Sequence, residues 1–120
     1  MKNILVVDDN QDIAELLKVT LEIAGYKCTS TNNGQQCLQL LSNNNFDLIL
    51  LDVAMPGITG VDVIKKVKSD SALSHNKIVF ITASSPTDEV EDDLMKQGAL
   101  DVLKKPITED ALLSAVAKYA

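Results

Sequence analysis

The stretch DLILLDVAMPGITG, residues 47–60, decides the fold. Its apolar run Leu48–Leu51 is typical of a strand that is buried on both faces, as in the middle of a parallel sheet. A carboxylate, Asp52, follows at once, and the turn residues Pro56 and Gly57 come behind it. The acid therefore stands where the core of the predicted sheet meets its rim.

Four further runs predict the other strands of this sheet. Residues 4–7, 77–83 and 99–105 are largely apolar, whereas residues 27–31 are more polar and suit an edge strand. Segments with apolar residues at helical spacing follow each run. Strands and helices alternate five times with short connections, which favours right-handed crossovers and a parallel sheet with helices on both faces. At 120 residues, the chain is expected to form one domain over residues 1–120.

Polar residues at helix starts mark some of the predicted boundaries. Thr59, with Asp62 three residues later, predicts a capping box. Ser85 followed by Pro86 predicts another helix start, and Val90 and Leu94 are expected on the apolar side of that helix.

Composition and charge exclude several classes of function. The net charge of −6 disfavours nonspecific binding to DNA, because a polyanion repels an acidic surface. Two cysteines, Cys28 and Cys37, are too few for a disulfide framework. The first residues lack the apolar region of a signal peptide, and no apolar run approaches the roughly 18–20 residues of a membrane span. A cytoplasmic protein with reduced thiols and no membrane partner is therefore expected.

Polar residues follow four of the five predicted strands and converge on one rim of the sheet. Asp8 and Asp9 follow the first strand, Asp52 the third, Thr82 ends the fourth, and Lys105 ends the fifth. In sheets of this kind, ligands bind beyond the carboxyl ends of the strands. The sequence therefore predicts a functional site there.

The three carboxylates point to a metal ion and to phosphoryl transfer. Like charges at close range raise one another's pKa, and a divalent cation with hard oxygen ligands, Mg²⁺, would relieve this repulsion. A carboxylate such as Asp52 can act as a nucleophile on phosphorus and form an aspartyl phosphate. Mg²⁺ and Lys105 would neutralise charge on the transferring oxygens.

Four motifs in order resemble the signatures of response regulator receiver domains of two-component signalling, including single-domain receivers of the chemotaxis type. They are VVDD (residues 6–9), LLDVAMPGITG (50–60), ITAS (81–84) and LKKP (103–106), and the resemblance covers the whole chain. It implies a flavodoxin-like α/β fold, a doubly wound five-stranded parallel sheet in strand order 2-1-3-4-5 flanked by five helices.

The resemblance also implies the roles of the metal-binding residues. Asp9 and Asp52 would bind Mg²⁺ directly, and Asp8 would act mostly through a metal-bound water. The backbone carbonyl of Ala54 would complete the protein ligands. Taken alone, Asp8 and Asp9 could instead be caps of the first helix, with Asn10 as the other candidate N-cap.

The resemblance assigns the phosphoryl chemistry to three side chains. Asp52 would be the phosphoryl acceptor, Lys105 would pair with it and later with a phosphoryl oxygen, and Thr82 would donate its hydroxyl to the phosphoryl group. Pro106 would follow a cis peptide bond and help to aim Lys105 inward. Lys104 is expected to be a surface lysine.

One position departs from the family pattern. Receivers often carry an aromatic residue four positions before the proline at the end of the fifth strand, where this chain has Val102. Without a ring, readout is expected to rely on backbone and loop shifts. Ala54 and Ser84, which in the family tune the hydrolysis of the acyl phosphate, are both small.

The function implied is a phosphorylation-controlled switch. A histidine kinase or histidine phosphotransfer protein would dock near the first helix and the Pro106–Ile107 loop and donate a phosphoryl group to Asp52. The surface of the fourth helix, fifth strand and fifth helix would respond, with the chain a monomer or a phosphorylation-dependent dimer. The downstream protein target is unknown, and direct binding of nucleic acid is not expected. The chain, ending at Ala120, is either a stand-alone receiver or an excised domain.

Three alternatives remain at this stage. The chain is expected to catalyse only its own phosphorylation and dephosphorylation, rather than to be an enzyme with turnover. A haloacid-dehalogenase-type phosphatase also uses an aspartate nucleophile and Mg²⁺, but it needs a second Asp where this chain has Ala54. A flavodoxin-like nucleotide or flavin binder would need a Gly-rich loop after the first strand, where Asp8 and Asp9 stand. A pseudo-receiver without phosphorylation is disfavoured by the intact set of acids and lysine.

Overall fold

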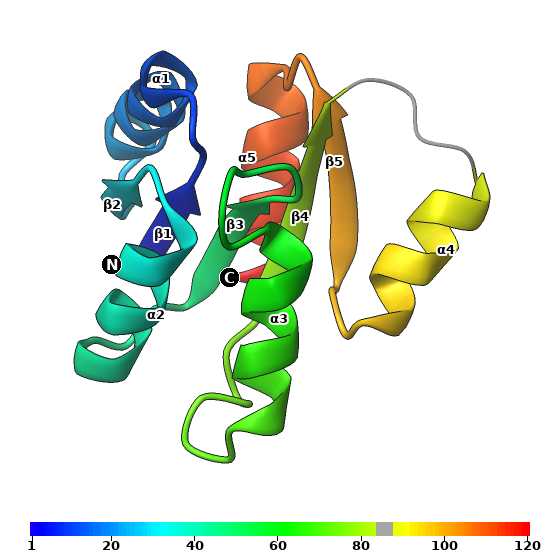
Figure 1. The fold of residues 1–120 in the computed structure, drawn as a ribbon. Helices are drawn as coiled ribbons and strands as arrows, with labels where there is room; N and C mark the ends of the chain where they lie inside the picture. Colours follow the sequence, from blue (N-terminus) through cyan, green and yellow to red (C-terminus); the bar gives the residue numbers. More distant parts are fainter. Residues whose placement is uncertain (84–87) are drawn as a thin grey trace.

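The computed structural model describes residues 1–83 and 88–120, and in these residues five strands alternate with five helices (Figure 1). The strands are β1 (Asn3–Val7), β2 (Lys27–Thr31), β3 (Leu48–Asp52), β4 (Ile78–Ala83) and β5 (Asp101–Lys105). The helices are α1 (Gln11–Ile23), α2 (Gly34–Asn43), α3 (Gly60–Ser69), α4 (Asp88–Lys96) and α5 (Glu109–Tyr119). The helix start expected at Ser85 and Pro86, and the position Ser84, lie outside the described residues.

The strands form one parallel sheet in the order β2-β1-β3-β4-β5, which confirms the predicted fold class. The polar strand β2 lies at an edge, as its composition indicated. Val6 of β1 pairs with Leu50 of β3, and Asp52 pairs with Ile81 of β4. Because all the strands run in the same direction, their carboxyl ends meet at one edge of the sheet.

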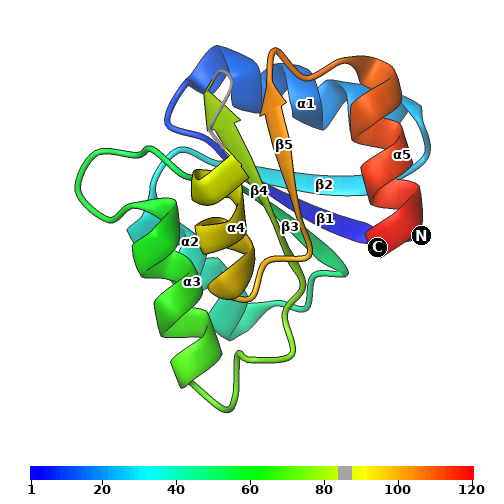
Figure 2. The same cartoon turned by 90° about the vertical axis from the view of Figure 1, so that its right-hand side faces the viewer.

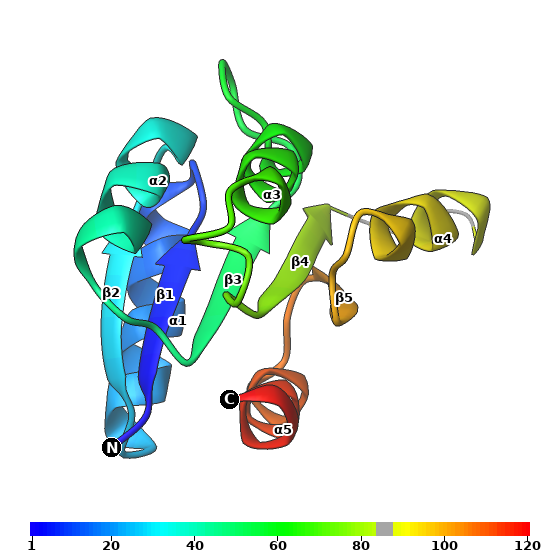
Figure 3. The same ribbon diagram turned by 90° about the horizontal axis from the view of Figure 1, so that it is seen from below.

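Helices cover both faces of the sheet. Figures 2 and 3 show α1 and α5 on one face and α2, α3 and α4 on the other. Successive side chains of a strand point to opposite faces, so Leu5, Ile49 and Leu51 pack in the core on the α2–α3–α4 side. Ile4 and Leu50 pack in the core on the α1–α5 side. Two buried faces explain why the central strands are apolar at every position.

The helices show one departure from the sequence prediction. Leu94 of α4 is buried, but Val90, one turn earlier, is 47% exposed, so its expected place on the packed side is wrong. The physical reason is that α4 meets the core near its C-terminal end, where Leu94 and Ala99 both pack. Among the helices of the described residues, none has the length and apolar character that crossing a bilayer requires.

Candidate functional site

Three strand ends bring the predicted acids and Lys105 to one edge of the sheet. Asp8 directly follows β1, Asp52 is the last residue of β3, and Lys105 is the last residue of β5. One carboxylate oxygen from each of Asp8, Asp9 and Asp52 lies within 4.8 Å of the other two. Lys105 Nζ lies 2.9 Å from Asp8 Oδ2 and 3.5 Å from Asp52 Oδ2. The structure therefore places these four side chains in a single site.

Hydrogen bonds fix the segment that carries Asp8. The Asp8 amide donates to the Thr31 carbonyl of the neighbouring strand (3.1 Å), and the Asn10 amide donates to Asp8 Oδ1 (2.9 Å). The Asn10 side chain accepts from the amides of the first turn of α1 and is its N-cap. Asn10 thus caps the helix, so Asp8 and Asp9 are not its caps.

The segment that carries Asp52 continues the sheet for one more residue. The Val53 amide donates to the Ile81 carbonyl (2.9 Å), and the Ala54 amide donates to Asp52 Oδ1 (3.2 Å). The Asp52 side chain is almost completely buried, with 2% of the residue exposed. Its carboxylate is therefore held by its own backbone turn against the other acids.

The surroundings of Asp52 shift the pKa of its carboxyl group toward neutral pH. Burial, the negative charge of Asp8 and a hydrogen bond with Asp9 together raise its pKa from 3.8 to about 7, against the opposing effects of Lys105 and the Ala54 amide. Burial acts to lower the pKa of Lys105, but its contacts with Asp8 and Asp52 outweigh this effect, and its pKa is raised. Lys105 is therefore a firmly charged cation among three acids.

The site fits a small divalent cation. Asp8 is completely buried, and its Oδ2 pairs with Lys105 Nζ (2.9 Å), so that one lysine faces three carboxylates. A single lysine cannot balance three clustered carboxylates, and a divalent cation would offset the remaining negative charge. The clustered donors are carboxylate oxygens, the hard ligands that Mg²⁺ prefers. Ala54 lies exposed at the same rim, next to Asp52.

Thr82 lies in β4, toward the same edge of the sheet as this cluster. It is half-buried in β4, one residue beyond Ile81, the partner of Asp52 in the sheet, and it lies opposite Lys104 in β5. Within the described residues, its hydroxyl forms no hydrogen bond with the carboxylates or with Lys105.

The two adjacent lysines at the end of β5 lie in different surroundings. Lys105 points into the acidic cluster, whereas the Lys104 side chain is 51% exposed and pairs with Glu91 of α4 (2.9 Å). The peptide bond between Lys105 and Pro106 is cis, as the resemblance implied. Lys105 was expected to pair with Asp52, but its closer contact is with Asp8. The positions of residues at strand ends predict which side chains gather at one site, but not which of them lie closest to one another.

Gly60, the first residue of α3, also contributes to the site and was not among the predicted site residues. A Cβ atom built on Gly60 would lie 2.3 Å from the backbone oxygen of Asp52. One signal was available in the sequence: Gly60 stands just inside the helix that Thr59 caps. Because glycine disfavours helices, its presence there indicates a position where another part of the backbone comes too close for a side chain.

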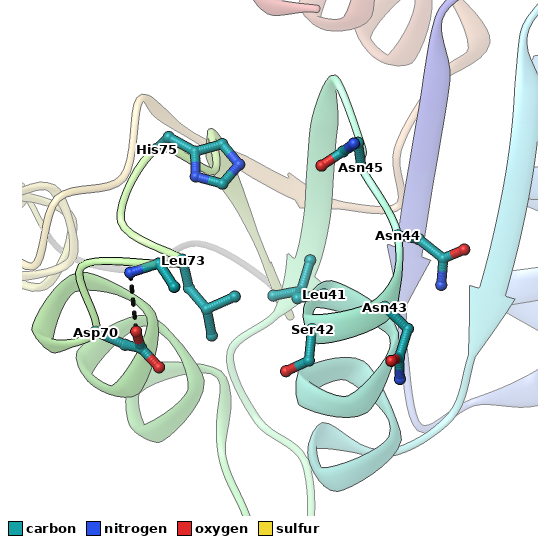
Figure 4. A pocket seen from close by; sticks show the side chains of 9 residues that line it. Leu41, Ser42, Asn43, Asn44, Asn45, Asp70, Leu73 and His75 are labelled. Carbon is teal, nitrogen blue, oxygen red and sulfur yellow. Dashed lines mark hydrogen bonds between the residues drawn. The ribbon is translucent and has the colours of Figure 1, made fainter.

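A separate pocket of about 370 Å³ lies between the end of α2 and the loop after α3, at the amino ends of the strands (Figure 4). His75 and Asp70 line it together with asparagines. The amides of Asn43 and Asn44 already donate to carbonyls of the last turns of α2, and Asp70 accepts from the Ala72 amide. This pocket is at the opposite end of the strands from the acidic cluster.

Comparisons with known proteins agree with this geometry. Residues 4–117 match the family model of the response regulator receiver domain. The chain is 37% identical over 113 residues to the uncharacterized transcriptional regulatory protein YrkP of Bacillus subtilis and 35% identical to the phosphate regulon transcriptional regulatory protein PhoB of Pseudomonas aeruginosa. These matches cover 94% of this chain, 47% of YrkP and 49% of PhoB.

Solved structures show the same fold. The chemotaxis protein CheY4 of Vibrio cholerae superimposes with a TM-score of 0.91 at 28% identity, covering 100% of this chain and 99% of CheY4. The response regulator TrrA of Thermotoga maritima, solved in complex with Mg²⁺-BeF, gives a TM-score of 0.86 at 34% identity and covers both chains completely.

The chain belongs to the response regulator receiver domain family. It is a receiver domain of the two-component systems, in which such domains act as phosphorylation-controlled signalling switches. The chain spans about half the length of the curated relatives it matches. Two of these relatives are named as transcriptional regulatory proteins, and that name describes the longer proteins.

Proposed function

We propose that Asp52 is the residue of this receiver domain that accepts the phosphoryl group. The observation that carries the proposal is the buried Asp52 carboxylate, grouped with Asp8 and Asp9 and 3.5 Å from Lys105 Nζ. Asp9 is exposed, and Asp8, although it is also buried, pairs more closely with Lys105 and accepts a hydrogen bond from the Asn10 amide.

The transfer step follows from nucleophilic chemistry at phosphorus. A carboxylate oxygen of Asp52 attacks the phosphorus of a phosphohistidine, the P–O bond forms, and the P–N bond to the imidazole breaks. The donor histidine leaves with the electron pair and becomes neutral by taking or keeping one proton. Dephosphorylation is a separate step: a water oxygen attacks the phosphorus, the P–O bond to Asp52 breaks, inorganic phosphate leaves, and the Asp52 carboxylate is restored.

Asp8, Asp9, Asp52 and the backbone carbonyl of Ala54 would hold Mg²⁺. When bound, the ion supplies positive charge that offsets the carboxylates and the oxygens of the incoming phosphoryl group. The close grouping of three carboxylates, all of them oxygen donors, supports this assignment.

Lys105 and Thr82 would stabilise the phosphoryl group once it is on Asp52. Lys105 already lies within 3.5 Å of Asp52 and has a raised pKa, so it offers a permanent charge to a phosphoryl oxygen. Thr82 lies near the end of the neighbouring strand, and its hydroxyl forms no hydrogen bond with the cluster in the described residues, so a contact with the phosphoryl group would accompany a local shift. Such a shift is the local event that could connect phosphorylation to the surface.

The chain would catalyse only its own phosphorylation and dephosphorylation. The haloacid-dehalogenase-type phosphatase mechanism needs an acid two residues after the nucleophile, and Ala54 stands there with its amide bonded to Asp52. The pseudo-receiver alternative has no support from the geometry, because the acids and the lysine converge.

The face of α1 beside the site is proposed to receive the phosphoryl donor, a histidine kinase or a histidine phosphotransfer protein. A largely apolar cavity of about 320 Å³ lies between α1 and the end of β5, lined by Leu16, Lys105, Pro106 and Ile107 among others. Leu16 is 65% exposed at its rim. An apolar surface adjoining the reactive edge suits a protein that must bring a histidine to Asp52.

The surface of α4, β5 and α5 is proposed to carry the signal to a protein target. Glu91 of α4 is joined to Lys104 of β5, the register partner of Thr82. Val102 in β5 is only partly buried and has no ring, so a backbone or loop shift would have to carry the change. No direct binding to nucleic acid is proposed for this chain, and it would act as a monomer or a phosphorylation-dependent dimer.

Intact mass spectrometry tests the proposed site. The chain is incubated with acetyl phosphate and Mg²⁺, and a single phosphoryl adduct is expected. Asp52→Asn is expected to abolish the adduct, whereas Asp110→Asn, an exposed acid on α5, should leave it unchanged. An adduct that forms at the same rate in Asp52→Asn would show that the acceptor is another residue. Release of phosphate from p-nitrophenyl phosphate over many turnovers would favour the phosphatase instead.

A further inference from the structure

The backbone at the end of β3 is clamped between two elements. On one side, the Val53 amide donates to the Ile81 carbonyl of β4 (2.9 Å). On the other side, the Gly60 amide at the start of α3 donates to the Val53 carbonyl (3.0 Å), which closes the loop of residues 53–60 at its base. The peptide that carries the Asp52 carboxylate and leads to Ala54 is therefore held from both directions.

The contact between α3 and this backbone is possible because residue 60 has no side chain. A Cβ on Gly60 would lie 2.3 Å from the Asp52 carbonyl oxygen, 2.9 Å from Val53 Cα and 3.0 Å from the Asp52 carbonyl carbon. All three atoms belong to the backbone, so no rotamer change can relieve the clash. Interiors are packed closely enough that such an overlap must displace one of the two elements.

We infer that Gly60 is a positioning residue for the acceptor site: the N-terminus of α3 seats directly on the Asp52 carbonyl and thereby sets where Asp52 and Ala54 stand relative to Asp8, Asp9 and Lys105. Asp52 and Ala54 move with their own backbone, whereas the other acids and Lys105 are carried by β1 and β5. A displacement at residue 60 therefore changes the distances between the two groups. The inference rests on the proposed function, because it concerns the same site.

Gly34 provides a matched control. A Cβ on Gly34, the first residue of α2, would lie 2.9 Å from Ile58 Cγ2 and 3.0 Å from the Ile58 carbonyl oxygen. Both glycines thus open a helix and both meet the loop of residues 53–60, but Gly34 meets its outer part and Gly60 meets the backbone of Asp52. Gly34→Ala and Gly60→Ala both strain the fold, and only the second strains it at the acceptor.

The experiment measures the increase in the free energy of unfolding that Mg²⁺ produces. Urea unfolding is followed by circular dichroism with and without about 10 mM MgCl₂, and the increase reports the affinity of the folded state for the ion. A variant that is unfolded in buffer is measured in trimethylamine N-oxide, which favours the compact state, against the wild type in the same solution. The adduct formed with acetyl phosphate is followed in parallel.

We expect Gly34→Ala to keep the wild-type response to Mg²⁺ and Gly60→Ala to bind Mg²⁺ at least tenfold more weakly, with a similar loss in the rate of adduct formation. A general loss of stability would lower the unfolding midpoint of both variants without changing the Mg²⁺ increment. If Gly60→Ala keeps the full Mg²⁺-induced increase in the free energy of unfolding, the inferred role of Gly60 is wrong, but the proposed acceptor site is not affected. A wild-type chain with no increment and no adduct would instead contradict the proposed site on which the inference rests.

Discussion

Lys105 Nζ lies 2.9 Å from Asp8 Oδ2 and 3.5 Å from Asp52 Oδ2, so one partly buried cation bridges two buried acids at the ends of different strands. Asp8 and Asp52 are both nearly inaccessible to solvent, and like charges in such surroundings repel strongly. The lysine therefore contributes to the stability of the fold as well as to the proposed chemistry.

Replacing Lys105 is expected to destabilise the protein when no Mg²⁺ is present. Lys105→Met leaves the buried acids uncompensated, and we expect the free energy of unfolding to fall by roughly 2 kcal/mol in urea with a chelator at pH 8. Lys104→Met is the control, because its pair with Glu91 is largely exposed and is worth at most about 1 kcal/mol. Equal losses in the two variants would contradict the bridging role of Lys105.

The stability is expected to depend on pH through Asp52. The pKa of Asp52 is about 7 in the folded protein and 3.8 in an unperturbed chain, so the folded state binds the proton more tightly. The stabilisation from the protonated carboxyl is fully present below about pH 4 and is lost as the pH rises through 7. Without Mg²⁺, the free energy of unfolding should fall between pH 5 and pH 8 by on the order of 2 kcal/mol.

Asp52→Asn tests this pH dependence. The amide cannot ionise, so the variant should be more stable than the wild type at pH 8 and should lack most of the fall between pH 5 and 8. Urea unfolding at a series of pH values measures both effects. A wild type and a variant with parallel pH profiles would show that another group is responsible.

Mg²⁺ and protons are expected to compete for the same cluster. Because a protonated Asp52 is a poor ligand, the Mg²⁺ increment in the free energy of unfolding should be larger at pH 8 than at pH 6. Asp8→Asn should reduce the increment at both values, since it removes a negative charge from the cluster, and Asp110→Asn should not. An increment that survives in Asp8→Asn would exclude this residue from the metal site.

The start of α3 is expected to depend on its capping box. The Thr59 hydroxyl accepts from the Asp62 amide (3.2 Å), and the Asp62 carboxylate accepts from the Thr59 amide (3.1 Å). Thr59→Ala should lower the free energy of unfolding by about 1 kcal/mol, and Thr59→Ser, which keeps the hydroxyl, should lose less. Thermal unfolding measures the difference, and equal losses for the two variants would show that the hydroxyl is not the stabilising group.

Much of the fold could be predicted from the sequence because each element has a local cause. The runs at residues 4–7 and 48–51 are apolar at every position, and only a strand covered on both faces uses such a run fully. Thr59 and Asp62, three residues apart in the sequence, form the capping box that marks the start of α3. The prediction failed at Val90, because helical spacing shows which residues share a face but not which turns of the helix reach the core.

By itself, the sequence determined the parallel alternating architecture and the set of residues at the strand ends, since hydrophobic period and strand position are local properties of a chain. Only the tertiary structure decided how these residues meet. Lys104 and Lys105 are adjacent and chemically identical, yet one pairs with α4 at the surface and the other bridges buried acids, because successive strand residues point to opposite faces. The close approach of Gly60 to the Asp52 backbone likewise exists only once α3 packs against β3. No local sequence pattern predicts which backbone atoms come together there.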